Sequence, residues 1–165
     1  MFFGAGPIPN TKTDAQSVFL HELGHIFAFN GFLNPATLSD VSVISTFDQH
    51  VVFDGANFFF AGPAATALYG DEVPLTRGND SHLGNPPPGP GADLISDLMN
   101  GVSFDRGRRY EITALDLAIV GDVGIGVIVA VPESATVLLL AMGTLSLGGA
   151  AWRRARRDRP NRITN

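Results

Sequence analysis

The chain has 165 residues, which suits one compact domain with an additional terminal segment, and it has no cysteine, which excludes disulfides and thiolate metal ligands. The net charge is −5, but 6 of the 11 basic residues and only 1 of the 16 acidic residues lie in residues 153–165, so residues 1–152 carry 5 basic and 15 acidic residues. A body this acidic argues against nucleic-acid binding, which needs a basic surface.

The first predicted element is a helix from about Ala15 to Phe29. Thr13 or Asp14 can cap its start, and Asn30-Gly31 can end it. Apolar residues surround its middle on nearly every side, a pattern that indicates a buried helix.

This helix carries the sequence His21-Glu22-Leu23-Gly24-His25. Residues four apart lie on one face of a helix, so His21 and His25 can bind one metal ion, and Glu22 can reach a water molecule on that ion. H-E-x-x-H is the pattern of zinc proteases, in which the metal acidifies the water and the glutamate takes its proton. Burial favours the same interpretation, because buried histidines and glutamates are costly unless they are paired or metal-bound.

The middle of the chain predicts a β-hairpin and a short helix. Residues 50–53 and 57–60 are apolar runs that flank Asp54-Gly55, a turn sequence typical of hairpins. Residues 63–69 form a helix candidate with proline in its first turn, and Gly70 ends it. Residues 74–93 are rich in glycine, proline and asparagine, which predicts a long loop; such loops are uncommon unless they are functional.

A catalytic zinc site usually has three protein ligands, so a third must lie elsewhere in the chain. Many metzincins extend the motif to H-E-x-x-H-x-x-G-x-x-H. This chain has Ala28 and Gly31 where that pattern has glycine and histidine, which leaves His50 and His82 as candidates. His50 lies in a strand-like run and His82 in the predicted polar loop, and their own surroundings do not choose between them.

The order of several short motifs resembles the leishmanolysin-like metzincins. That family carries H-E-x-x-H, a helix ending in Tyr-Gly, a Ser-His dipeptide with the third histidine, a Leu-Met turn beneath the metal, and a helix ending in Asp-x-Gly. The matching segments here are His21–His25, Leu68-Tyr69-Gly70, Ser81-His82, Leu98-Met99 and Asp122-Val123-Gly124, the last after a predicted helix from Glu111 to Val120. The resemblance covers residues 15–124.

This resemblance implies an α+β fold and a set of site residues. His21, His25 and His82 would bind Zn²⁺, Glu22 would be the general base, and Met99 would form the apolar floor of the site. Residues 1–128 would be a partial metzincin-like catalytic domain. Twenty residues precede His21, too few for the sheet that metzincins place ahead of the active-site helix, so the domain is expected to be incomplete at its amino terminus and the chain to be inactive or unstable.

The carboxyl-terminal part predicts a membrane anchor. Residues 134–152 are uncharged and just long enough to cross a bilayer as a helix. Trp152 sits where an interfacial aromatic residue would, and the arginine cluster after it marks the cytoplasmic side. The motif Val131-Pro132-Glu133-Ser134-Ala135-Thr136, the apolar span and the arginines resemble a PEP-CTERM sorting signal, here residues 129–165.

In that family the signal marks exported proteins of Gram-negative bacteria, and an exosortase processes it. The implied location is the cell envelope, anchored in the inner membrane before processing and then at the surface or outside the cell. The expected function is that of an exported zinc-dependent endopeptidase acting on proteins or peptides. The alternative is a non-catalytic cell-envelope or extracellular-matrix protein with a structural or vestigial zinc site.

Overall fold

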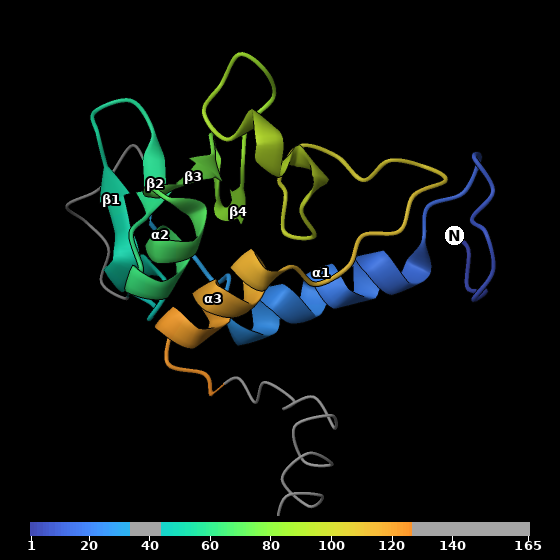
Figure 1. The fold of residues 1–165 in the computed structure, drawn as a ribbon, viewed down its shortest axis with the longest axis horizontal. Helices are drawn as coiled ribbons and strands as arrows, with labels where there is room; N and C mark the ends of the chain where they lie inside the picture. The colour runs from blue at the N-terminus through green and yellow to red at the C-terminus, as the bar shows by residue number, and fades with distance from the viewer. Residues whose placement is uncertain (34–43, 127–165) are drawn as a thin grey trace, which may run out of the picture. The chain divides into compact units, whose positions relative to one another are not determined.

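The computed structural model describes residues 1–33 and 44–126. Within them the fold is α+β, as predicted, with three helices and a four-stranded antiparallel sheet. In chain order the elements are α1 (Ala15–Phe27), β1 (Val51–Phe53), β2 (Phe58–Phe60), α2 (Pro63–Tyr69), β3 (Val73–Thr76), β4 (Asn79–Leu83) and α3 (Ala114–Asp122), with short 3₁₀ turns at Asp48–His50 and Ala92–Ser96. Figure 1 shows α1 as the longest element, with α3 beside it.

No helix in the described residues is long and apolar enough to cross a membrane. The predicted membrane span, residues 134–152, and the sorting signal that contains it lie outside those residues.

Helix α1 begins at the predicted residue and ends two residues earlier than predicted. Of the two candidate caps it uses Asp14, whose carboxylate accepts a hydrogen bond from the Ser17 backbone N–H at 3.1 Å. The helix ends because Ala28 leaves helical geometry, with φ −141°, and Phe29 enters the core with 1% of its surface exposed. Burial of this aromatic side chain therefore sets the end of the helix.

The sheet has the order β1-β2-β3-β4, with every neighbouring pair antiparallel. The predicted hairpin is confirmed, with Phe53 opposite Phe58. Its turn is held by Asp54, whose carboxylate accepts hydrogen bonds from two backbone N–H groups at 2.7 Å each. His50 lies in a 3₁₀ turn just before β1 rather than in the strand itself.

The prediction of a long loop over residues 74–93 is wrong, because β3 and β4 form a second hairpin there. Strand β3 is buried along its whole length although it contains a proline, and β4 is polar until Leu83. Side-chain hydrogen bonds hold the hairpin: Asn85 accepts from the Arg77 N–H and donates to the Leu75 carbonyl, both at 2.9 Å. Neither strand has the alternation of apolar and polar residues that would have identified it.

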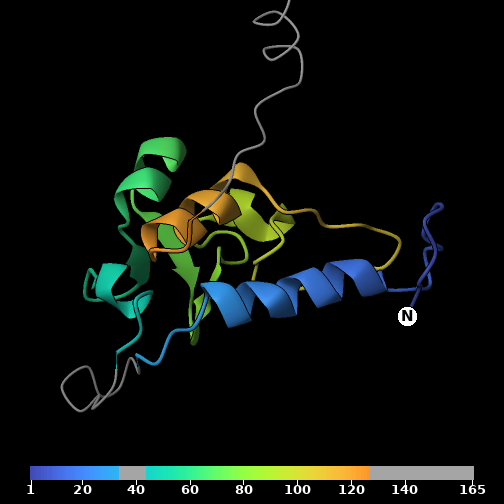
Figure 2. The same cartoon turned by 90° about the horizontal axis from the view of Figure 1, so that it is seen from below.

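The predicted helix over residues 63–69 is confirmed as α2, and it ends at Gly70, whose φ is +94°. The third helix begins three residues later than predicted, at Ala114, because Thr113 caps it. The Asp122 carboxylate then accepts hydrogen bonds from the backbone N–H groups of Ala64 and Ala65 at 2.9 Å each, which joins the end of α3 to the start of α2. Figure 2 shows the same three helices from below, with α1 and α3 again adjacent.

Candidate metal centre

Three histidine side chains meet where α1 passes β4. His21 and His25 project from α1 and His82 from β4. Their Nε2 atoms form a nearly equilateral triangle: 3.1 Å from His21 to His25, 3.1 Å from His21 to His82 and 3.0 Å from His25 to His82. These three residues lie close enough to hold a metal ion.

The tautomers of the two α1 histidines are set by backbone carbonyls. The Nδ1 atom of His21 lies 2.8 Å from the carbonyl oxygen of Leu98, and that of His25 lies 2.8 Å from the carbonyl oxygen of Phe29. A carbonyl oxygen can only accept, so each Nδ1 carries the proton and each neutral ring keeps its lone pair on Nε2. Two lone pairs 3.1 Å apart repel each other unless a cation lies between them, and carbonyl-oriented histidines are typical of metal ligands.

The spacing of the triangle fits a metal ion bound by imidazoles. Two nitrogens at bonds of 2.0–2.1 Å on a tetrahedral Zn²⁺ lie roughly 3.3 Å apart, close to the separations between the three Nε2 atoms. Neutral imidazole also suits copper, iron and nickel, so the donor set points to a first-row divalent metal without selecting one.

Burial favours the neutral form of two of the rings. It lowers the pKa of His21, and it lowers the pKa of His82 to about 4, with His25 and His21 adding to the second effect through their charges. A metal ligand must be neutral, so His21 and His82 meet this condition at physiological pH.

His82 reaches the site because the chain after α1 runs along β4. A Cβ added at Gly31 would lie 3.5 Å from the Cβ of Ser81. Gly31 is the position at which the extended metzincin motif has its third histidine, so β4 brings His82 close to the place from which that side chain would come. The other candidate, His50, is not in the group: its Nε2 lies 3.0 Å from the Asp122 carbonyl oxygen.

Met99 is almost fully buried and packs against α1 at Gly24, one residue before His25. A Cβ on Gly24 would collide with the Met99 sulfur, so glycine permits this close contact. Met99 therefore lies beneath the helix that carries two of the histidines.

Sequence reasoning missed a polar network that supports Leu98. Asp97 accepts hydrogen bonds from the Met99 N–H at 2.9 Å and from the Thr113 hydroxyl at 2.8 Å. Thr113 and Asp116 form a reciprocal capping box at the start of α3. The spacing Thr113-x-x-Asp116 is a sequence signal for this capping box, but not for its contact with Asp97. Through this network α3 fixes the turn whose carbonyl orients His21.

The prediction that the helix buries Glu22 is wrong, because Glu22 is exposed; it lines a cleft of about 290 Å³ that also reaches His21 and His82. Phe104 forms another wall of this cleft, and its ring meets that of His21 edge to face, with the centroids 5.1 Å apart. The cleft thus brings together two of the three histidines, a carboxylate and an aromatic surface.

Comparisons with models of protein families, with curated proteins and with solved structures find no match to this chain.

Proposed function

We propose that this chain is a zinc-dependent endopeptidase, with His21, His25 and His82 as the metal ligands. The observation that carries the proposal is the convergence of three Nε2 atoms within 3.1 Å beside a cleft that Glu22 lines. Zinc bound there would act as a Lewis acid toward the scissile carbonyl and would acidify a bound water.

Glu22 is proposed as the general base. Its exposed carboxylate follows His21 directly in α1 and lines the same cleft. It would accept the proton of the attacking water and later return that proton to the leaving amine. The Leu98 and Phe29 carbonyls would hold His21 and His25 in the orientation that binding requires.

The number of ligands supports a catalytic site over a structural one. A structural zinc site is closed by four protein ligands, whereas a catalytic site keeps a position for water. In residues 1–33 and 44–126 the group consists of three histidines. The cleft beside them also gives a substrate access to the site.

We further propose that the protein is exported to the cell envelope of a Gram-negative bacterium. The support is the order of a Pro-Glu-Ser motif, the uncharged residues 134–152 and the arginine cluster. Processing by an exosortase would remove the span. Expressing the chain with and without an exosortase, and comparing the mass of the product, tests this; a mass independent of the enzyme would refute processing.

The direct test of the endopeptidase proposal is Glu22→Gln in the zinc-loaded protein. The variant should keep one zinc per chain by atomic emission and lose nearly all cleavage of a quenched fluorescent peptide library. Zinc stoichiometry is measured independently of cleavage, so the metal site and the activity are tested separately. Glu72→Gln, an exposed glutamate elsewhere, is the matched control. Unchanged peptidase activity in Glu22→Gln would rule out this mechanism.

A further inference from the structure

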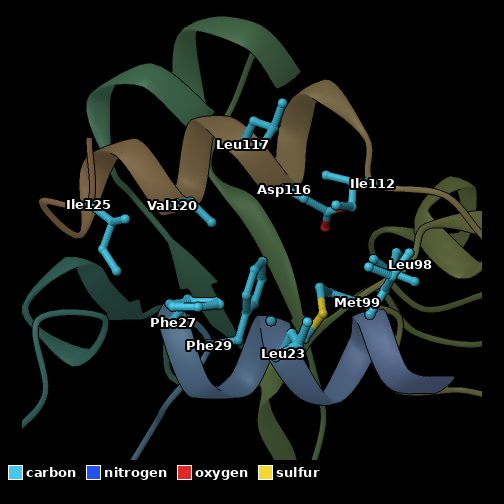
Figure 3. Close-up of a pocket in the computed structure, with 12 residues that line it drawn as sticks. Leu23, Phe27, Phe29, Leu98, Met99, Ile112, Asp116, Leu117, Val120 and Ile125 are labelled. Atoms are coloured by element: carbon cyan, nitrogen blue, oxygen red, sulfur yellow. The ribbon is translucent and has the colours of Figure 1, made fainter. Parts of the chain in front are cut away.

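A second cavity lies between α1 and α3, with a volume of about 290 Å³ (Figure 3). Within residues 1–33 and 44–126 its walls are apolar except for one carboxyl group. Leu20, Leu23 and Phe27 of α1 and Leu117 and Val120 of α3 form much of its wall.

The cavity is separate from the cleft beside the histidines. Leu20, Leu23 and Phe27 follow the three- and four-residue spacing of one face of α1, while His21 and His25 occupy another. Both sites use residues of α1, but no residue lines both the cavity and the cleft.

Among the described residues that line the cavity, Asp116 is the only charged one, and its carboxyl group is only partly satisfied. The residue is 3% exposed. One carboxyl oxygen, Oδ2, accepts a hydrogen bond from the Thr113 N–H at 2.8 Å. The other, Oδ1, is buried and has no hydrogen-bond partner in the described structure. Figure 3 shows the carboxyl group directed into the space between the two helices.

A second carboxyl group, that of Asp97, lies close to Asp116. Burial is the main cause that raises the pKa of Asp116, and the neighbouring Asp97 raises it further. Two carboxyl groups close together in a low-dielectric environment require a proton or another cation between them. A proton shared with Asp97, or the cationic group of a bound molecule, would satisfy Oδ1.

The opposite end of the cavity is suited to an apolar body. Phe27 and Phe29 supply aromatic surface, and the remaining walls are aliphatic. Aromatic rings attract ammonium groups through their π faces as well as apolar groups through contact. A cavity with aromatic and aliphatic walls and a carboxyl group at one end favours molecules that carry a cationic group on an apolar body. It disfavours fatty acids and other anions.

We propose that this cavity binds a small apolar amine, with its ammonium group on Oδ1 of Asp116 and its apolar body between α1 and α3. The volume suits a ligand of one ring and a short chain. The proposal does not rest on the proposed peptidase activity, because the cavity wall includes none of the three histidines or Glu22.

The mouth of the cavity offers apolar surface of its own. Phe27, Ile112 and Leu117 are 54%, 51% and 41% exposed. A second copy of the chain could cover this rim instead of a small molecule. The pair of carboxyl groups of Asp116 and Asp97 favours the amine over a second copy of the chain. The apolar rim of a second copy would bring no positive charge to Oδ1 of Asp116.

The test is a calorimetric titration of the intact chain with 2-phenylethylamine and with 2-phenylethanol, its neutral counterpart of similar shape. The amine should bind with one-to-one stoichiometry and at least about 10-fold more tightly than the alcohol. In Asp116→Asn this preference should disappear, while the Asn side chain can still accept from the Thr113 N–H. Asp71→Asn, an exposed carboxylate changed in the same way, should keep the preference.

A second variant keeps the proposal testable if Asp116→Asn does not fold. Val120→Phe places a larger side chain into the cavity and should abolish binding of both probes. Absence of saturable amine binding to the unmodified chain would overturn the proposal. So would equal affinities for the two probes, or a concentration-dependent dimer in sedimentation equilibrium that Val120→Phe dissociates.

Discussion

The imidazole Nδ1–H of His21 donates a hydrogen bond to the carbonyl oxygen of Leu98, 2.8 Å away and 77 residues further along the chain. This contact joins the helix that carries two histidines to a turn whose own position depends on Asp97. The orientation of His21 is therefore determined by residues far from the H-E-x-x-H motif.

Asp97→Ala is expected to weaken metal binding without removing a ligand. Asp97 holds the turn by accepting from the Met99 N–H and from the Thr113 hydroxyl, and its loss frees the Leu98 carbonyl from its fixed position. Loss of a group that orients a ligand typically costs 10–100-fold in metal affinity, so a fall of about that size is expected. Competition with a chromophoric chelator measures it. Asp93→Ala is the control and should change zinc affinity less than about threefold; an equal loss in both variants would remove the specific role of Asp97.

Two glycine substitutions should have opposite effects. A Cβ at Gly101 would lie 2.7 Å from the Cβ of His82 and 2.8 Å from that of Thr76. Both neighbours are close to the backbone and cannot move without shifting the chain. Gly101→Ala should therefore displace His82, lower zinc affinity and destabilise the fold by about 1–3 kcal/mol.

A Cβ added at Gly121 would have no heavy atom within 4 Å outside its own stretch of helix. Gly121→Ala in α3 should stabilise the protein by up to about 1 kcal/mol, because alanine is the better helix former, and should leave zinc binding unchanged. Urea unfolding of both variants, with and without zinc, measures the difference. A loss of zinc affinity in Gly121→Ala would show that the effect of Gly101→Ala is not specific to His82.

The sequence predicted the local elements of this fold better than its long-range contacts. The first helix, the Asp54-Gly55 hairpin and α2 follow from capping, turn chemistry and apolar runs, which act over a few residues. The hairpin of β3 and β4 was missed because the side chain of Asn85 and the burial of β3 hold it, and neither leaves a periodic pattern.

The same distinction applies to the metal centre. His21 and His25 follow from helical spacing alone, since both lie within one turn of α1. His82 is 57 residues from His25, and its own surroundings gave no reason to prefer it to His50. Only the order of motifs along the chain favoured it. The support from Asp97 and Asp116 depends on α3 folding back onto the turn, which no local pattern encodes.

The stability of the metal-free protein should fall as the pH rises above 6.5. Burial and Asp97 raise the pKa of Asp116 to about 8, so the folded protein holds a proton that the unfolded chain releases near pH 4. Where the folded state binds more protons, raising the pH lowers the free energy of unfolding. Histidines with lowered pKa values act in the opposite direction, but only below their ordinary pKa of about 6.5.

The free energy of unfolding in EDTA should therefore drop between pH 6.5 and 8.5, by on the order of 2 kcal/mol. Asp116→Asn removes the titrating group, so its urea midpoint should be flat over the same interval. A similar drop in Asp116→Asn would assign the effect to another group.

We expect His82, and not His50, to be the third metal ligand. His82→Ala removes one of three convergent nitrogens and leaves His21 and His25, which should lower zinc affinity by several orders of magnitude and the zinc content after dialysis to well below one per chain. His50→Ala instead removes a hydrogen bond to the Asp122 carbonyl at the end of α3. That bond is worth about 1 kcal/mol, so this variant should unfold at slightly lower urea concentration and keep its full zinc content. Loss of zinc from the His50 variant alone would assign the third ligand to His50, because a stability effect of that size cannot empty a metal site in a protein that remains folded.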